Sequence, residues 1–358
     1  MFRKVTLMST IACSLAACGG ITTTDSGVSY DYTQGPSSSE AAAEQAMPIR
    51  AMSSTQYLTP NGTAYSSLSL ANQTLNSGQD TVATSDTSAR TAWRSGWTGK
   101  NVKVGIPDDF NASSRIDIHG DWVALVSQSI APEANYHKID MIGSVTDMTA
   151  DQALKYFEDN GYHIINGSWG IDRFDPQKSG AEYTDFDAHV VRLVEEFDQN
   201  AENAKKALII YAAGNSGSYC SGKRSERCSL QQVVIDSLRK EGKTAGESTI
   251  FVGSLDDNSN SMADYSIVAG NLKNDFIVAH DDVLASGDAS GTSFAAPRVT
   301  GAAALVRHKF PNLTSPQLKQ VLLQTATDLG DPGVDDVYGY GKLNIEGALS
   351  PIGKVVPK

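Results

Sequence analysis

The chain from about residue 89 onward alternates short apolar runs with longer segments in which apolar residues recur at helical spacing. Apolar runs of about four to eight residues are typical of buried strands, and a period of about 3.6 residues is typical of amphipathic helices. The pattern therefore predicts strands and helices in turn. The predicted strands are residues 102–106, 162–165, 207–211 and 249–253, and the predicted helices are residues 151–159, 186–197, 231–239 and 315–326.

Two of these helices begin with local signals in the sequence. Thr149 and Gln152 fit a capping box before the helix at 151–159, and Ser315-Pro316 is a favourable start for the last helix. Repeated alternation of strand and helix predicts an α/β fold of three layers, with a mostly parallel central sheet and helices on both faces. Ligand sites in such sheets lie at the carboxyl ends of the strands.

The first 17 residues have the pattern of a signal peptide. Arg3 and Lys4 precede an apolar stretch, residues 5–17, that is too short for a permanent membrane helix. It ends in Leu15-Ala16-Ala17-Cys18, which resembles the bacterial lipobox, so Cys18 is the expected lipidation site and the first residue of the mature chain. An ordinary signal peptide with an incidental cysteine is the alternative.

The residue after this cysteine bears on localisation. Gly19, rather than Asp, resembles the lipoproteins that diderm bacteria send to the outer membrane. We therefore expect a cell-envelope lipoprotein, facing either the periplasm or the cell surface, that contacts the membrane through Cys18.

Residues 18–88 read as a disordered tether. Of the 70 residues from 19 to 88, 24 are Ser or Thr, and no sustained apolar period runs through them. Such a composition cannot bury enough surface to offset the entropy of ordering. A flexible coil of this length spans roughly 45 Å. A folded pro-segment is the competing interpretation.

The composition of the whole chain limits the kinds of molecule that it is expected to bind. A net charge of −12 and a pI of about 4.9 argue against binding to nucleic acid, and 40% hydrophobic residues suffice for a full core. We expect a monomer. Residues 89–350 are the expected folded domain, and residues 351–358 are a tail.

Two cysteines remain in the expected mature domain. Cys220 and Cys228 flank a short polar loop, and in an oxidising compartment we expect them to form a disulfide. A metal pair is the alternative, although no His or third Cys stands near them.

The segment Gly291–Pro297 carries the first candidate for chemistry. Ser293 lies between a Gly-Thr lead and an Ala-rich run, which predicts its hydroxyl at a helix N-terminus, where developing negative charge is favoured. Pro297 is expected in the first turn, where a missing N–H is tolerated. A Thr-Ser cap on a buried helix is the structural alternative.

Three further residues complete the requirements of acyl transfer by a serine. Asp108 ends the first predicted strand, His119 opens a helical run, and Asn215 follows the apolar strand at 207–211. The reaction needs a base for the serine proton, a carboxylate that orients the base, and a donor to the oxyanion. The four residues supply one of each.

These motifs resemble those of the subtilisin-like serine proteases. The segment Gly291–Pro297 is similar to the family's nucleophile motif, and the order Asp, His, Asn, Ser is similar to theirs. The resemblance implies that Ser293 attacks, His119 is general base and acid, Asp108 orients it, and Asn215 donates its side-chain amide to the oxyanion, together with the Ser293 backbone N–H. It implies a serine endopeptidase of subtilisin-like fold, acting on proteins or peptides.

The same resemblance implies a binding site. The segment around Ser168, Trp169 and Gly170 resembles the family's substrate-pairing strand, which takes an extended peptide as an added strand. Ala212, Ala213 and Gly214 would line the pocket for the side chain before the cut bond, and their small size predicts a large apolar or unselective preference. Close packing is the alternative reason for such small residues.

The chain departs from the family near the base and before the nucleophile. Asp108-Asp109-Phe110 replaces Asp followed by Thr-Gly or Ser-Gly, so a slip by one residue would exchange Asp108 with Asp109. The second acidic residue, Asp109, resembles the acidic residue that neighbours the catalytic Asp in the kexin-like branch of this family. Asp121 and Trp122 follow His119-Gly120, and a carboxylate there is expected to raise the pKa of His119. Ala279-His280-Asp281-Asp282 stands where Ala-Pro-Gly is common.

No cofactor is required by this chemistry, and no metal site is predicted. Calcium is frequent in the family, but no Asp-rich loop has a recognisable ligand spacing. The other histidines are expected to be surface or packed residues, with His280 the one candidate for a metal ligand. They are His137, His163, His189, His280 and His308.

Two other functions compete with the lipid-anchored endopeptidase. One is a catalytically inactive lipoprotein of the same fold that binds peptides or partner proteins, which Asp121 and Trp122 motivate. The other is a truncated relative of autotransporter proteases, since residues 348–353 resemble the junction after which such chains continue.

Overall fold

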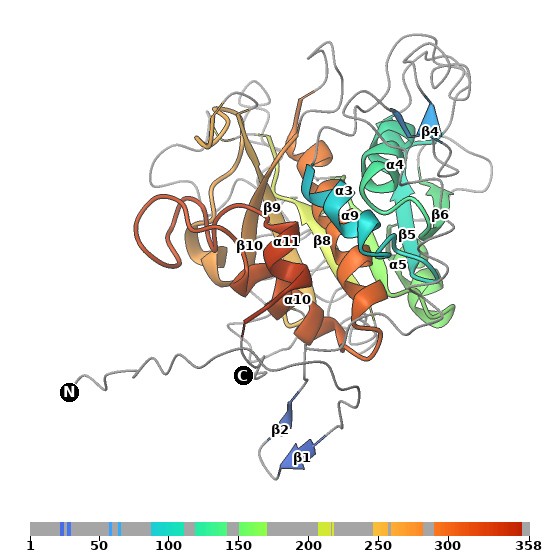
Figure 1. The fold of residues 1–358 in the computed structure, drawn as a ribbon. Coiled ribbons are helices and arrows are strands. Elements are labelled where there is room, and N and C mark those ends of the chain that lie inside the picture. The colour runs from blue at the N-terminus through green and yellow to red at the C-terminus, as the bar shows by residue number, and fades with distance from the viewer. Residues whose placement is uncertain are drawn as a thin grey trace.

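The computed structural model describes residues 87–110, 119–141, 150–169, 207–215, 217, 246–256, 259–281 and 290–352, with four short strands before them (Figure 1). Those strands form two antiparallel pairs within the segment predicted as a tether. They are β1 Thr22–Thr24, β2 Gly27–Ser29, β3 Tyr57–Leu58 and β4 Ala64–Tyr65. Several predictions lie outside the described residues: the helices at 186–197 and 231–239, the cap at Thr149, Cys18, Gly170, Cys220, Cys228 and residues 353–358.

The centre of the domain is a six-stranded sheet in the order β10-β9-β8-β7-β5-β6, and every pairing within it is parallel. All four predicted strands are present, within two residues at each end. β6 and β10 were not predicted. The strands are β5 Lys103–Asp108, β6 Asn135–Asp140, β7 Ile164–Gly167, β8 Leu208–Ala212, β9 Thr249–Leu255 and β10 Phe276–His280.

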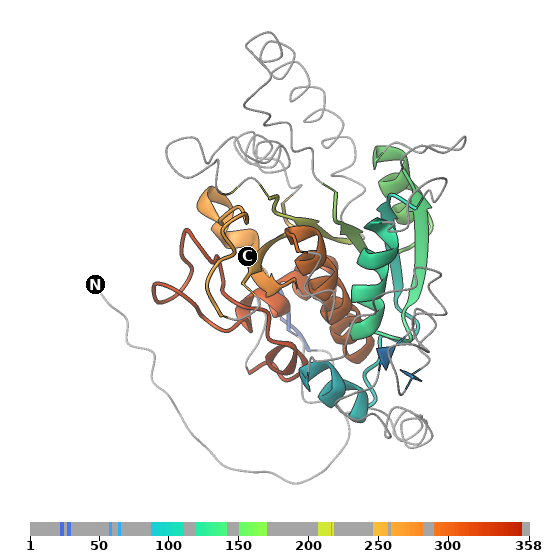
Figure 2. The same cartoon turned by 90° about the horizontal axis from the view of Figure 1, so that it is seen from above.

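Helices cover both faces of this sheet, which confirms the predicted α/β architecture. α9 contacts β7, β8, β9 and β10 from one face, beside α4, and α5 contacts β5. Figure 2 shows α9 on one side of the strands. The helices are α3 Thr87–Arg94, α4 His119–Ile130, α5 Ala150–Asp159, α9 Thr292–Lys309, α10 Ser315–Gln324 and α11 Ile345–Leu349, with a 3₁₀ helix, η3, at Gly270–Asp275.

The strand side chains alternate between two buried clusters, as the pleat of a strand requires. In β8, Leu208, Ile210 and Ala212 belong to the cluster around α9. Ile209 and Tyr211 belong to the cluster that contains Leu154 and Phe157 of α5. Because both faces are buried, β8 reads as a continuous apolar run in the sequence.

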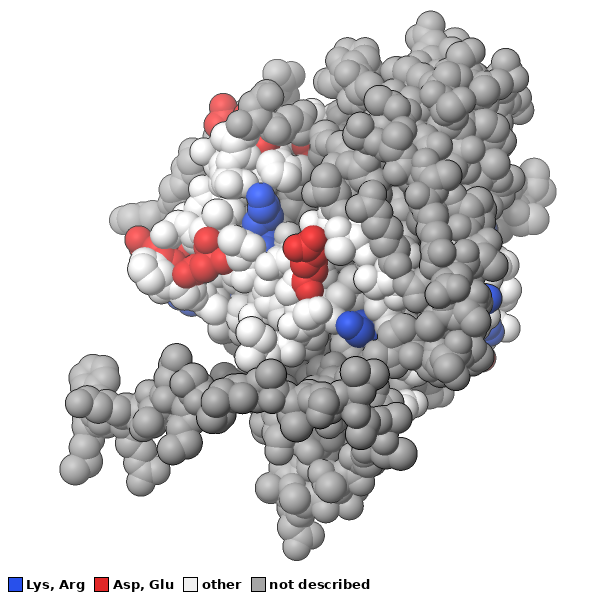
Figure 3. Space-filling model, viewed as in Figure 1, with Lys and Arg blue, Asp and Glu red and all other residues white. Residues whose placement is uncertain are grey.

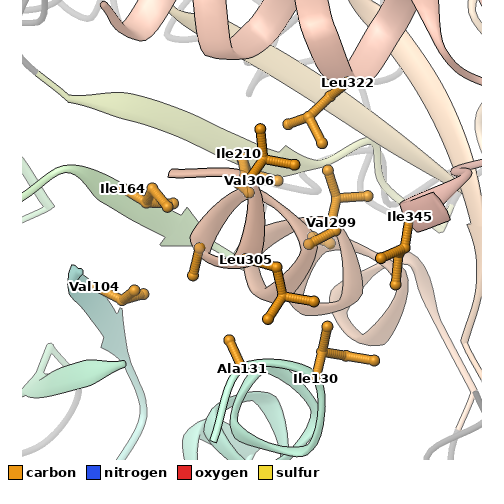
Figure 4. Close-up of a cluster of buried hydrophobic side chains, with 14 of the residues drawn as sticks. Val104, Ile130, Ala131, Ile164, Ile210, Val299, Leu305, Val306, Leu322 and Ile345 are labelled. Atoms are coloured by element: carbon orange, nitrogen blue, oxygen red, sulfur yellow. The ribbon is translucent and has the colours of Figure 1, made fainter. Parts of the chain in front are cut away.

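α9 lies at the centre of the larger cluster. Figure 4 shows Val299, Leu305 and Val306 of this helix among side chains from β5, β7, β8, the end of α4, α10 and α11. Gly301 lets α4 approach closely, because a Cβ there would lie 2.5 Å from Cβ of Ile130. The N-terminus of α9 is therefore positioned by most of the core.

The last helices differ slightly from prediction. α10 has the capping box of Thr314 and Gln317, with Pro316 in its first turn, and it ends at Gln324 rather than at residue 326. The hydroxyl of Thr325 bonds to the carbonyl of Val321, and Thr325 caps the helix.

The segment before the sheet docks against this core. α3 packs on α11, and it begins two residues before the predicted domain start at residue 89. Trp93 is buried, and its Nε1 donates to the carbonyl of Ile130 at 2.8 Å. The backbone N–H of Thr98 donates to Nδ1 of His308 at 3.1 Å, near the end of α9.

The described part of one face of the molecule shows no concentration of charge of one sign (Figure 3). On the side drawn in Figure 3, the basic and acidic side chains that are described lie scattered among uncharged ones. Within the described part of the chain, no helix has both the length and the apolar character needed to cross a membrane.

Candidate active site

The candidate residues gather where the strand order reverses. β5 pairs with β6 on one side and with β7 on the other, so the chain leaves β5 in one direction and later returns beside it. The carboxyl ends of the strands at such a point are the usual ligand site of a parallel sheet. Asp108 is the last residue of β5, Ser168 follows β7, and Asn215 follows β8.

Asp108 and His119 form a short contact at this edge. Nδ1 of His119 lies 2.6 Å from Oδ1 of Asp108, and the carboxylate is buried. The same oxygen accepts the N–H of Asp109 at 2.7 Å. The structure thus brings Asp108 to the imidazole. His119 is the first residue of α4, as predicted, and the N–H of Gly120 donates to the carbonyl of Asp109 at 2.9 Å.

The contact orients the imidazole and sets its charge. Burial by itself lowers the pKa of His119, but the hydrogen bond to Asp108 and the charges of Asp108 and Asp109 together raise it above its usual value of 6.5. Because Nδ1 faces Asp108, Nε2 is the nitrogen that remains for other groups.

The two unusual residues after His119 have other partners in the structure. Asp121 pairs with Nζ of Lys138 at 2.8 Å, and it is not among the groups that raise the pKa of His119, contrary to expectation. Lys138 also lies 5.4 Å from the centre of the Phe110 ring. Trp122 belongs to the hydrophobic core.

Ser293 is the second residue of α9, which confirms the predicted helix start. Its neighbours Thr292 and Phe294 are buried, whereas Ser293 is partly exposed. The Phe294 ring lies 5.5 Å from the ring of His119, centre to centre, so the first turn of α9 is beside the imidazole. No hydrogen bond joins the Ser293 hydroxyl to His119 among the described residues, and such contacts often shorten only when a substrate binds.

Pro297 is the sixth residue of α9, so the prediction that it lies in the first turn was wrong. A proline there cannot donate to the carbonyl four residues earlier, which belongs to Ser293. The hydroxyl of Ser168 donates to this carbonyl instead, at 2.7 Å. Ser168 thus supplies the hydrogen bond that the helix itself lacks.

Ser168 is the end of a buried polar chain. Nδ2 of Asn166 donates to Oγ of Ser168 at 2.9 Å, and Oγ1 of Thr300 donates to Oδ1 of Asn166 at 2.8 Å. All three side chains are at most 1% exposed. The chain therefore fixes two successive turns of α9, at Ser293 and at Thr300, to the end of β7.

Asn215 is exposed at the end of β8, and its amide is held in one orientation. Oδ1 accepts the N–H and the hydroxyl of Thr292, both at 2.9 Å. The hydroxyl oxygen of Thr292 accepts the N–H of Gly214 at 3.0 Å. Because Oδ1 accepts from Thr292, the Nδ2 group is the part of the amide that remains to donate to other groups.

The residues predicted to bind substrate lie around the start of α9, but several side chains face the core. Trp169 packs edge-on against Tyr211, with ring centres 5.6 Å apart. Ala212 and Ala213 are buried in the two hydrophobic clusters. Ser168 contacts α9, as does the backbone of Gly214.

Sequence reasoning missed several residues of this site. Thr292 holds Asn215, and Asn166 with Thr300 holds Ser168. Asp281 bonds to the N–H of Gly291, the residue before α9. The signal for Asp281 was its place in a segment that departs from the family, where only the neighbouring His280 was considered. The described residues contain no group of three His, Cys, Asp or Glu that could hold a metal ion.

A buried carboxylate that orients an imidazole, beside a serine at a helix N-terminus, is the arrangement of a hydrolase with a serine nucleophile. The model of the subtilase family, peptidase S8, matches residues 62–341. The chain therefore belongs to the subtilase family and is a subtilisin-like serine endopeptidase.

Individual relatives agree with this assignment. Subtilisin DY of Bacillus licheniformis is 29% identical over 282 residues, which cover 71% of this chain and 92% of that protein. The neisserial autotransporter lipoprotein NalP of Neisseria meningitidis is 46% identical over 61 residues, covering 17% of this chain and only 6% of that much longer protein.

The solved structures support the fold. The prenylagaramide maturation protease PagA superimposes with a TM-score of 0.50 at 21% sequence identity, covering 73% of this chain and 97% of that one.

Proposed function

We propose that this protein is an exported, lipid-anchored endopeptidase in which Asp108, His119 and Ser293 form the catalytic triad. The observation that carries the proposal is the 2.6 Å contact of Asp108 with His119, beside the first turn of α9. Asn215 is the side-chain donor of the oxyanion site.

In this mechanism Nε2 of His119 accepts the proton of Ser293 as its hydroxyl attacks the peptide carbonyl. Asp108 keeps Nδ1 protonated and stabilises the imidazolium. The developing oxyanion is bound by Nδ2 of Asn215 and by the backbone N–H of Ser293. His119 then gives its proton to the leaving amine, and water hydrolyses the acyl-enzyme by the same steps.

The peptide substrate would pair with the backbone of residues 168–170 as an extended strand. Ala212, Ala213 and Gly214 would form the wall of the pocket before the cut bond. Since Ala212 and Ala213 are buried in the core, a rigid wall made largely of backbone supports a broad preference for apolar side chains.

The envelope location rests on the sequence and on the relatives. Lipidated Cys18, a flexible tether over residues 18–88 and a disulfide between Cys220 and Cys228 suit an exported protein of a diderm bacterium. The similarity to a lipoprotein protease supports this part of the proposal. The protein would act as a monomer without a required cofactor, and calcium remains an expectation from the family only.

The decisive experiment replaces the nucleophile. Ser293→Ala should abolish both peptide hydrolysis and labelling by a fluorophosphonate, because the attacking oxygen is lost while the surrounding fold is unchanged. Ser350→Ala, at an exposed serine after α11, is the matched control and should retain full activity. Unchanged turnover in Ser293→Ala contradicts the proposal.

A catalytically inactive binding protein is the alternative, and the same measurements separate the two. Its motivation was Asp121 and Trp122, which the structure places in an ion pair and in the core. A folded wild-type protein that binds peptides but neither cleaves them nor reacts with the fluorophosphonate would favour that alternative.

A further inference from the structure

The turn before α9 is held by a buried carboxylate that the mechanism above does not use. Asp281 directly follows β10 and is 2% exposed. Its Oδ2 accepts hydrogen bonds from the backbone N–H of Gly291 and from the hydroxyl of Tyr265. Asp281 thus joins the end of the edge strand to the N-cap residue of the helix that carries Ser293.

Gly291 depends on other residues to hold its position, because as the N-cap residue it has no side chain that could bond to the first turn of α9. Its φ of 148° is a conformation that favours glycine. A Cβ at this position would lie 3.2 Å from Nδ2 of Asn215. The turn is therefore fixed from one side by Asp281 and lies against Asn215 on the other.

Tyr265 links the same carboxylate to the loop of Asn215. The carbonyl of Tyr265 accepts the N–H of Gly217 at 2.8 Å, and the N–H of Ile267 donates to the carbonyl of Gly214 at 3.0 Å. Burial and the hydrogen bond to Asp281 raise the pKa of Tyr265, so the hydroxyl stays protonated as a donor.

The two donors of the proposed oxyanion site both depend on this turn. One is the N–H of Ser293, which follows Gly291-Thr292 directly. The other is Nδ2 of Asn215, whose Oδ1 is bound to the N–H and hydroxyl of Thr292. A shift of Gly291 would therefore change the separation and direction of both donors, and catalysis is sensitive to such displacements.

We propose that Asp281 and Tyr265 are positioning residues for the oxyanion site, which act through the backbone N–H of Gly291. This inference rests on the proposed function. It also gives a role to Asp281, which lies in the segment at 279–282 that departs from the family pattern.

The test compares kcat and KM of single variants of the full chain on one peptide, per active site titrated with fluorophosphonate. Tyr265→Phe should lower kcat by about three- to tenfold, and Asp281→Ala by about 10- to 100-fold, with KM within about twofold. Asp281→Asn keeps an acceptor oxygen for Gly291 and should recover much of the loss. Tyr338→Phe, outside this network, is the matched control.

A double-mutant cycle shows whether the pair acts through the oxyanion site. In an Asn215→Ala background, where one donor is already lost, Asp281→Ala should cause a clearly smaller loss of kcat than in the wild type. An equal loss in both backgrounds, or wild-type kcat in Tyr265→Phe and Asp281→Ala, overturns the inference. If Asp281→Ala does not fold, the kcat of Tyr265→Phe and its double-mutant cycle with Asn215→Ala decide whether the inference holds.

Failure of the proposed function has a different signature. It would be seen before any variant of Asp281 or Tyr265 is compared, as equal peptide turnover in the wild type and in Ser293→Ala, or as no turnover by the folded wild-type protein.

Discussion

At the scale of single residues, the charge of His119 is set by groups from the end of β5. Asp108 contacts the ring, whereas Asp109 acts on it through its charge alone. Asp121, although closer in sequence, is neutralised by Lys138. Proximity along the chain was therefore a poor guide to which carboxylate affects the imidazole.

This difference gives a prediction for the pH dependence. In the proposed mechanism His119 must be neutral to accept a proton, so kcat/KM should fall as the pH drops through its raised pKa, above 6.5. Asp109→Asn removes a negative charge that favours the imidazolium, so the pKa should fall and the acid limb should move to lower pH. The measurement is kcat/KM from pH 5 to pH 9, a range of roughly two pH units either side of neutrality.

Asp331→Asn, at an exposed position in the loop after α10, is the control and should leave the profile in place. An acid limb in Asp109→Asn that coincides with that of the wild type contradicts the assignment.

The sequence pointed to the proposed catalytic residues more readily than to the residues that hold them in place. Asp108, His119, Ser293 and Asn215 were predicted because their chemistry is distinctive and their order resembles that of a family. Thr300 and Asp281 act by single hydrogen bonds to distant segments. Such contacts depend on tertiary structure, and the sequence around each residue does not predict them.

At the scale of elements, α9 is held to β7 by polar contacts as well as by apolar packing. The Pro297 break in the helix ladder and the Ser168 hydroxyl that compensates for it are parts of one arrangement. Asn166 and Thr300 extend this arrangement with two further hydrogen bonds. The position of α9 along its axis and the direction of Ser293 are therefore coupled to the end of β7.

Removing the far end of this chain should therefore weaken catalysis. Thr300→Val keeps the shape of the side chain but leaves the buried Oδ1 of Asn166 without its donor. We expect a loss of about 1–3 kcal/mol in stability and a lower kcat with little change in KM. Thr300→Ser restores a hydroxyl and should recover both quantities. Urea unfolding and steady-state kinetics provide the measurements.

Thr325→Val is the matched control, since it removes a hydroxyl bonded only within α10. Wild-type kcat in Thr300→Val would show that the chain stabilises the fold without orienting Ser293.

The apolar pattern predicted most of the strands whose burial is nearly complete, although β10 was missed with four of its five residues buried. β8 and β9 were found because all of their residues are buried. β6 was missed because the run Asn135–Asp140 lies at the edge of the sheet and is mostly polar and partly exposed. Pro297 was misplaced because its sequence position suits a first turn, and only the observed helix start at Thr292 shows otherwise.

At the scale of the whole molecule, the segments at the two ends of the domain pack against the same helix layer. α3 lies on α11, and Thr98 contacts His308 near the end of α9. Lys309 donates to the carbonyl of Leu349 at 2.6 Å. The segment at residues 87–98 is thus part of the core, although composition alone placed its first residues in the tether.

The stability of the domain should depend on this segment. Trp93 is 1% exposed, so Trp93→Ala should lower the free energy of unfolding by about 3–5 kcal/mol. Ser95→Ala, at an exposed position just after the same helix, should change it by less than about 0.5 kcal/mol. Denaturant titration of both variants gives the comparison, and equal midpoints would mean that the segment folds apart from the core.

The buried position of α9 has a consequence for the synthesis of the chain. Asp108 and His119 leave the ribosome long before the helix that carries Ser293, and the core needs that helix to form. A nascent chain therefore holds an orienting carboxylate and a base without a nucleophile until almost the whole domain has been translated. In the proposed mechanism such a chain lacks the attacking oxygen, so it cannot yet cleave a peptide bond.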